Sequence, residues 1–297
     1  MTSNSQVHRL DRPQLTFAIV SAGAAVITAA LVLLDDRVLL GAPLWMKPFK
    51  FFISATLMSL TLAYVIPRIS QKSKRVQIAS LTIIGSLAVE LVLITWAAAS
   101  ETTSHFNVSS PLAIAVWSAM ATFIGLVWVA TMVLTLAYVR FGQDEAAMKR
   151  ALSWGMGISI VGMAVAFFMT GPNSDQLANF EGIAGAHTVG AADGGPGLPL
   201  FGWSTVAGDL RIAHFFGLHA LQAIPLAVLL LRKNITIRGI DAIGLGYLLL
   251  VGLLTSQALM RQSIVETSTG FAIAIAVAVV LPVVGALIQG RAAKVRS

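Results

Sequence analysis

The fold is decided by one polar stretch that heads an apolar run: Gly208-Asp209-Leu210-Arg211-Ile212-Ala213-His214-Phe215-Phe216-Gly217-Leu218-His219-Ala220-Leu221-Gln222. The apolar run continues to Leu231. On a helix with about 100° per residue, Arg211 and Gln222 lie nearly on one line, and His214 and His219 fall on opposite flanks of it. A broad polar face on a helix otherwise suited to lipid must meet protein, water or a ligand. The stretch therefore predicts a membrane-spanning helix that carries part of a site.

Composition extends this prediction to the whole chain. The protein has 297 residues, of which 57% are hydrophobic and only 11% charged, and long apolar runs recur along it. Such runs are typical of transmembrane helices. We therefore expect an all-α fold, a polytopic transmembrane helix bundle that forms a single domain over residues 1–297. Apolar length predicts eight spans, at 14–34, 45–66, 76–99, 111–139, 151–170, 207–231, 240–260 and 267–289.

The distribution of basic residues predicts the orientation. With both termini inside, 15 of the 20 lysines and arginines lie in inner segments, as the positive-inside rule requires. The net charge of +7 is thus a topology signal, and we expect no nucleic-acid partner. The absence of cysteine excludes disulfides, thiolate metal sites and covalently attached c-type haem. The inner basic residues are Arg9, Arg12, Arg68, Lys72, Lys74, Arg75, Arg140, Lys149, Arg150, Arg232, Lys233, Arg238, Arg291, Lys294 and Arg296.

One outer connection, residues 171–206, is much longer than the others. It is rich in turn residues but too apolar for a disordered linker. Long ordered loops are often lids, so a lid is the favoured interpretation and a plain cap the alternative. A short similarity also links Lys47-Pro48-Phe49-Lys50-Phe51-Phe52 with Arg211-Ile212-Ala213-His214-Phe215-Phe216, which open two spans with the same direction. It does not extend beyond six residues, so coincidence is favoured over duplication.

Polar residues gather in the outer half of the predicted bundle. Glu90 is the one carboxylate deep in an apolar run, at a depth between those of His214 and His219. A lone carboxylate there is costly, so it should be protonated, paired or metal-bound. Lys50 and Arg211 are suited to hold an anionic group. The candidates are Glu90, His214 and His219 for catalysis or proton transfer; Lys50, Arg211, Gln222 and Asn107 for substrate binding; and His214, His219, His105 and Glu90 as metal ligands.

The histidine spacing leaves three interpretations open. Histidines at i and i+4 can share a metal ion, but His214 and His219 are at i and i+5, about 140° apart. They are therefore expected to have separate partners, one on each side of the helix. A metal or haem site, a hydrogen-bonded proton, substrate or quinone site, and polar packing between helices all remain open. Few ionisable groups lie on a path through the inner half, which counts against a proton-coupled transporter.

Three stretches carry a resemblance to other proteins. They are Trp45-x-Lys47-Pro48-x-Lys50-Phe51, Ser104-His105-Phe106-Asn107, and Asp209-x-Arg211-x-x-His214-Phe215-x-Gly217-Leu218-His219-x-x-Gln222. With these stretches the chain resembles an uncharacterised group of multi-spanning bacterial integral membrane proteins. The resemblance implies a shared membrane fold and brings no activity with it. We expect a multi-pass protein of the inner (cytoplasmic) membrane, and a homo-oligomer is compatible with this class.

These observations lead to two functional hypotheses. The first is a membrane-embedded redox enzyme (an oxidoreductase) that uses a haem or a divalent metal at an outward-facing His/Glu/Arg site. The second is a carrier or binding protein for a lipid or small anion, without metal, in which the same residues line the cavity. In both, the partners are the lipid bilayer and a small-molecule or lipid substrate. A structural or assembly role is a third interpretation.

Overall fold

The computed structural model describes residues 10–71, 73–231 and 235–295 of the chain. It confirms the all-α fold, because eight of its helices are long and apolar enough to cross a membrane. Each predicted span agrees with a helix to within about five residues at most ends. The eight helices are α1 (Arg12–Leu34), α2 (Met46–Val65), α3 (Lys74–Ala99), α4 (Pro111–Phe141), α5 (Ala146–Val165), α7 (Leu210–Leu231), α8 (Ile237–Leu259) and α9 (Thr269–Val295).

Local sequence signals explain where several helices begin. The side chain of Asp11 accepts a hydrogen bond from the backbone of Gln14 at the start of α1, and Ser73 caps α3 in the same way. Ser110 caps α4, whose first residue is Pro111. A hydroxyl or carboxylate at the N-cap satisfies a backbone N–H that the helix leaves unpaired, and proline at the first position loses no hydrogen bond.

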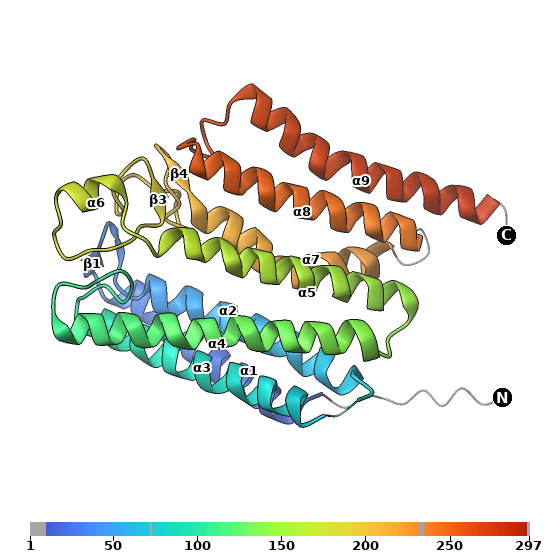
Figure 1. The fold of residues 1–297 in the computed structure, drawn as a ribbon, viewed down its shortest axis with the longest axis horizontal. Coiled ribbons are helices and arrows are strands. Elements are labelled where there is room, and N and C mark those ends of the chain that lie inside the picture. Colours follow the sequence, from blue (N-terminus) through green and yellow to red (C-terminus); the bar gives the residue numbers. More distant parts are fainter. Residues whose placement is uncertain (1–9, 72, 232–234, 296–297) are drawn as a thin grey trace.

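The helices form two groups of four that pack in the same order. Helices α1–α4 form one group and α5, α7, α8 and α9 the other, as Figure 1 shows. Within each group the first helix packs most extensively on the second and the third on the fourth, and the first and second also touch the third. Helices α2 and α7, which open with the two similar six-residue stretches, hold equivalent places. The groups meet mainly between α4 and α5, and a shared apolar core includes Leu62, Leu134, Met156 and Leu221.

The connection between the two groups is held firmly at one point. Asp144, in the short segment between α4 and α5, accepts hydrogen bonds from the hydroxyls of Tyr64 and Tyr138 at 3.0 and 2.6 Å. Its carboxylate also lies 3.2 Å from the guanidinium of Arg68, which stacks over the ring of Tyr64. Only 8% of the Asp144 side chain is exposed, so this connection is anchored to the first group.

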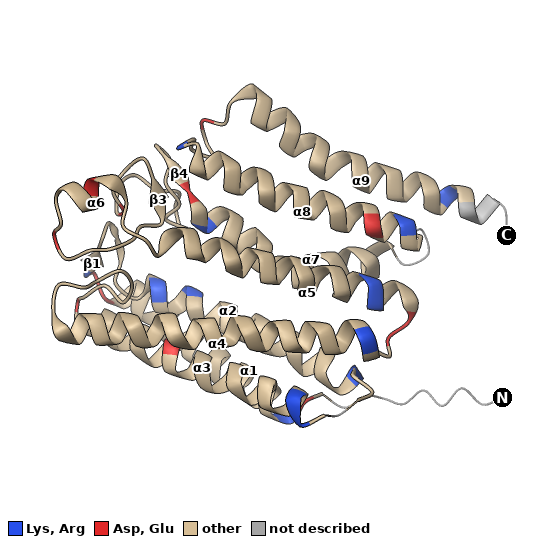
Figure 2. Cartoon of the chain, in the orientation of Figure 1, with Lys and Arg blue, Asp and Glu red and all other residues tan. Residues whose placement is uncertain are grey.

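The two ends of the bundle differ in character. The start of α1 and the end of α9 lie at the same end, where most of the basic residues in the described ranges gather (Figures 1 and 2). We call the opposite end, which carries the long connection, the loop end. Because the number of spans is even, the first and last spans must begin and end on the same side. That the basic end faces inward stays a prediction. Five of the basic residues assigned to inner segments lie outside the described residues: Arg9, Lys72, Arg232, Lys233 and Arg296.

The long connection is folded over the loop end. It contains the short helix α6 (Ser174–Ala178) and strand β3 (Thr188–Val189), which pairs with β4 (Gly208–Asp209) directly before α7. A second small hairpin joins β1 (Val38–Leu39) to β2 (Ala42–Pro43) between α1 and α2. Short 3-10 turns extend α2 over Ile66–Arg68 and α5 over Ala166–Met169. Residues 171–206 thus carry short elements of their own, and their role as a lid stays a prediction.

Candidate binding site at the loop end

Lys47 is the centre of a polar cluster at the loop end. Its ammonium group lies 3.1 Å from Nδ1 of His105. An ammonium can only donate, so this nitrogen must be the unprotonated one and the imidazole is neutral. The pKa of His105 is lowered well below its ordinary value by burial and by the charge of Lys47. This contact joins α2 to the connection between α3 and α4, where the ring of His105 packs against Phe106, which in turn contacts His187 of the long loop.

A histidine–aspartate pair lies in the long loop beside this cluster. Nδ1 of His187 is 2.6 Å from a carboxylate oxygen of Asp193, which also accepts hydrogen bonds from the backbone of His187 and Thr188. Burial would raise the pKa of Asp193, but these hydrogen bonds hold it well below its usual range. Burial lowers the pKa of His187, so a neutral ring donates from Nδ1 and keeps a lone pair on Nε2. Its ring packs edge-on against Phe106.

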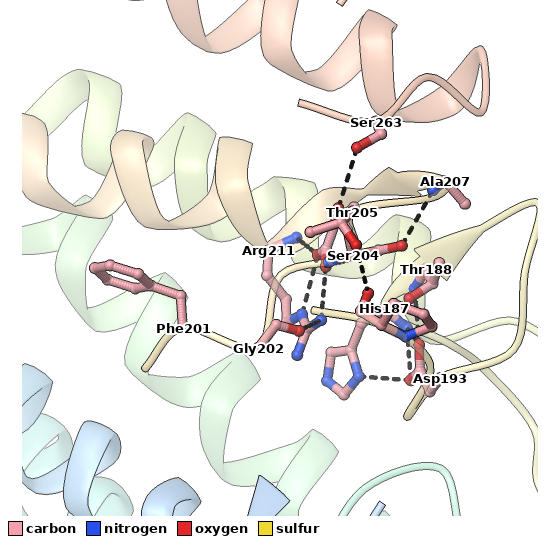
Figure 3. Close-up of polar contacts among 12 residues, drawn as sticks. His187, Thr188, Asp193, Phe201, Gly202, Ser204, Thr205, Ala207, Arg211 and Ser263 are labelled. Carbon is pink, nitrogen blue, oxygen red and sulfur yellow. Dashed lines mark hydrogen bonds and ion pairs between the residues drawn. The ribbon is translucent and has the colours of Figure 1, made fainter. Parts of the chain in front are cut away.

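Two of the predicted substrate-binding cations hold the long loop in place. Nζ of Lys50 donates to the carbonyl of Phe201 at 3.0 Å, and the guanidinium of Arg211 donates to the carbonyl of Gly202 at 2.6 Å. Arg211 also forms an ion pair with Asp209, whose side chain is fully buried. Figure 3 shows Arg211 reaching the loop beside His187, whose electrostatic environment includes the Arg211 charge. Cations from both helix groups thus fasten one turn of the loop.

His214 and His219 have different hydrogen-bond partners in the structure. Nδ1 of His214 donates to the carbonyl of Gly162 on α5 at 2.8 Å. Nδ1 of His219 lies 3.3 Å from Oε1 of Gln222, whose amide donates to Thr61 on α2 at 2.9 Å. Because carbonyl oxygens only accept, each neutral ring donates from Nδ1 and keeps the lone pair of Nε2.

The proposed metal ligands do not converge on one ion. In residues 10–71, 73–231 and 235–295, no three His, Asp or Glu side chains meet in a group that could hold a metal. A shared site of His214, His219, His105 and Glu90 is therefore not formed in this arrangement, because the Nδ1 atoms of the three histidines contact different helices and loops. Glu90 is only 3% exposed, and its Oε1 has no hydrogen-bond partner. The charge that reaches Glu90 is that of Lys47.

Asn107 stands apart from the cluster. Its side chain donates to Thr102 at 3.2 Å and accepts from the backbone and hydroxyl of Ser109, so it shapes the turn that leads into α4. It lines a cavity of about 140 Å³ together with Trp96. A second cavity, of about 220 Å³, is lined by Arg211 and by loop residues that include Thr188 and Pro196. The structure therefore places two substrate-binding candidates, Asn107 and Arg211, at different cavities.

Several members of the cluster were not among the predicted site residues. His187 and Asp193 pair across six residues of a loop, where no periodicity relates one position to the other. Lys47 and His105 are 58 positions apart. One available signal was that Lys47 and Lys50 open α2 one turn apart, since cations at a helix N-terminus oppose the dipole and require partners.

Comparisons with protein-family models, with curated proteins and with solved structures give no match. The described residues form a multi-pass membrane protein with a half-buried, cation-rich cluster at the loop end.

Proposed function

We propose that the loop end binds an anionic amphiphile, a lipid with a phosphate or carboxylate head group, and that the protein is a binding protein or carrier for it. The observation that carries the proposal concerns Lys47 and Lys50. In the part of the chain that the structure describes, neither lysine has a carboxylate within ion-pair distance, and both donate to neutral acceptors. Charge-assisted hydrogen bonds to an anion would be stronger than these.

Apolar surface beside the cations supports an amphiphile over a free ion. Phe51 follows Lys50 on α2 and is 37% exposed, and Phe215 on α7 is 36% exposed. The ring of Phe215 packs against Phe201, the residue whose carbonyl Lys50 holds. A head group at the lysines would thus place a hydrocarbon chain along aromatic side chains within the membrane-spanning helices.

The lid interpretation follows from the same contacts. An anion that reaches Lys50 competes with the carbonyl of Phe201 for the same ammonium group. Binding would therefore release the turn around Phe201 from α2, while Arg211 still holds Gly202 from α7. The long loop would act as a cover that the ligand loosens on one side.

The test is lipid binding to purified protein in detergent, measured by native mass spectrometry and by thermal stabilisation. Phosphatidylglycerol should bind more tightly than phosphatidylcholine, and Lys50→Gln should weaken the preference by about tenfold or more, equivalent to about 1.4 kcal/mol. Lys74→Gln, an exposed lysine at the opposite end of the bundle, is the matched control and should bind as the wild type does.

An inorganic phosphate arm separates the two sources of anion. If phosphate alone competes fully with phosphatidylglycerol, the ligand is a small anion and the hydrocarbon contributes nothing. If Lys50→Gln and the wild type bind phosphatidylglycerol equally, the lysines are not the site and the proposal fails.

A redox enzyme with haem or a divalent metal is the second candidate, and one observation favours it. Metal-binding histidines almost always donate their other ring N–H to a carbonyl or carboxylate, and His214, His219 and His187 all do so. Each would then need ligands from the cofactor or a second protein group. Elemental analysis and an absorption spectrum of the purified protein decide this candidate, which fails if neither metal nor a Soret band is present.

A further inference from the structure

Four buried polar atoms without a hydrogen-bond partner lie in helices α1, α2 and α3. They are Oε1 of Gln14, Oγ of Ser21, Oγ of Ser59 and Oε1 of Glu90, and each of these residues is at most 3% exposed. A buried polar atom without a partner costs free energy, and proteins commonly satisfy such atoms with ordered water. Because these atoms are concentrated in three adjacent helices, we consider a role that they share.

The two serines differ from the other hydroxyls of the same helices. Thr28 on α1 and Thr56 and Thr61 on α2 each donate to the carbonyl four residues before, as helical hydroxyls usually do. Ser21 and Ser59 do not, so their hydroxyls are available to other groups. Both are buried, and the two helices that carry them pack extensively on each other.

The residues around the serines are mostly small. The buried face of α1 consists of Gln14, Ala18, Ser21, Ala25 and Thr28. On α2, Ser59 is one turn from Ala63, whose carbonyl accepts a hydrogen bond from the backbone of Asp11 at the start of α1. The same face of α2 therefore meets α1, and the seam between the two helices is lined by alanine and serine.

These polar groups lie at successive heights along the bundle, and we call the set from Gln14 to Glu90 the ladder. The Asp11–Ala63 hydrogen bond and the bonds from Gln14 to Ser80, at 3.0 and 3.2 Å, fix the relative heights of the three helices. With about 1.5 Å per residue, Gln14 and Ser80 lie about 5 Å above Asp11, and the remaining groups follow at increasing height. The approximate heights are about 6 Å for Ser59, about 15 Å for Ser21, about 20 Å for Glu90 and about 24 Å for Lys47.

Glu90 is the protonatable group of the ladder. Helix α3, which carries Glu90, packs most extensively on α4, then on α2, and also touches α1, and Lys47 of α2 lies about 4 Å higher than Glu90. Lys47 in turn contacts His105, in the connection at the loop end. By these heights Glu90 lies just below the Lys47–His105 contact at the loop end, and the serines lie between Glu90 and the basic end.

We propose that helices α1, α2 and α3 form a proton pathway, with Gln14 and Ser80 at its inner entrance, Ser59 and Ser21 as hydroxyl relays and Glu90 as the group that takes up and releases each proton. Each transfer moves one proton between oxygen atoms of hydroxyls, water and the carboxyl group, and nothing is oxidised or reduced. The pathway does not depend on the proposed anion site. The scarcity of ionisable groups in the inner half does not oppose it, because hydroxyls and water can relay protons without carrying charge.

The test is proton flux in vesicles that contain entrapped pyranine, a pH-sensitive dye. Purified protein is reconstituted in phosphatidylglycerol–phosphatidylcholine vesicles, and valinomycin with a potassium gradient imposes a membrane potential. Wild-type vesicles should take up protons faster than protein-free vesicles. Glu90→Gln, nearly identical in shape, should remove this excess flux, and Ser59→Ala should reduce it.

Two controls make the result specific. Ser153→Ala removes a hydroxyl on α5 that bonds the carbonyl of Lys149, outside the pathway, and should leave the flux unchanged. Thr255→Ala removes a hydroxyl on α8 that bonds the carbonyl of Val251 and should also leave the flux unchanged. Lipid binding is measured separately from proton flux, so the two proposals can fail separately. Wild-type flux equal to that of protein-free vesicles would overturn the pathway, and so would a Glu90→Gln or Ser59→Ala protein that melts like the wild type and conducts equally well.

Discussion

Replacing Gly217 by alanine should force α5 and α7 apart and disturb His214. The two helices touch at Gly162 and Gly217, where backbone faces backbone. A Cβ atom added at Gly162 would lie 2.5 Å from Cα of Gly217, and one added at Gly217 would meet Cα of Gly162 equally closely. Ordinary carbon–carbon contacts are about 3.5–4.0 Å, so the helices must separate by about 1 Å.

The cost has three parts. Overpacking of this kind costs about 1–3 kcal/mol. The separation also stretches the 2.8 Å hydrogen bond from His214 to the carbonyl of Gly162, whose loss costs about 1 kcal/mol. Alanine offsets about 0.5–1 kcal/mol, because it is the better helix former. The Gly217→Ala protein should therefore be less stable than the wild type by about 1–3 kcal/mol.

Thermal unfolding in detergent, followed by tryptophan fluorescence, measures the effect. Gly125→Ala on α4 is the matched control, since a Cβ there meets nothing within 4 Å, and this variant should melt at or above the wild-type temperature. If Gly217→Ala is as stable as Gly125→Ala, the close approach of α5 and α7 is not a constraint and the placement of His214 loses its basis.

Three further outcomes are expected. Burial lowers the pKa of His187 and lowers that of His105 further, so both rings are neutral in the folded protein and take up protons on unfolding. The melting temperature should therefore fall as the pH drops below about 6.5. A melting temperature that does not change with pH would contradict this. Tyr138→Phe removes a buried hydroxyl that donates to Asp144 at 2.6 Å and should cost about 1–3 kcal/mol in a denaturation assay, where an unchanged stability would be inconsistent with that bond. Leu200 has a φ of 68°, so Leu200→Gly should leave stability equal or raise it by up to about 1 kcal/mol, and a clear loss would show that the turn is not strained.

The spans could be predicted because apolar length is a local property of the sequence. Each of the eight helices follows from its own run, and α4 begins at Pro111 as the predicted span does. The i and i+5 spacing disfavoured one ion shared by His214 and His219; in the structure their partners are Gly162 on α5 and Gln222 on the same helix, respectively.

The site could be predicted only in part, because its contacts are not periodic. Lys50 donates to the backbone carbonyl of Phe201. Every residue has a backbone carbonyl, so this contact could not be predicted from residue types. The pair of His187 and Asp193 depends on the shape of a loop. Glu90 could be identified from the sequence because it is a charged residue in an apolar run. Ser21 and Ser59 are common residue types in such helices, and only the structure shows that their hydroxyls lack hydrogen-bond partners among the described residues.

The anchoring of Asp144 gives the molecule a pivot. Because the tyrosines and Arg68 fix the connection to the first helix group, a rotation of one group against the other would turn about the basic end. Helices of about 20 residues are about 30 Å long, so a tilt of about 10° would displace the loop end by about 5 Å and the pivot by almost nothing. The 3.0 Å hydrogen bond between Lys50 and Phe201 is at the loop end, far from Asp144. A small rotation about Asp144 would therefore be enough to break this bond and release the loop from α2.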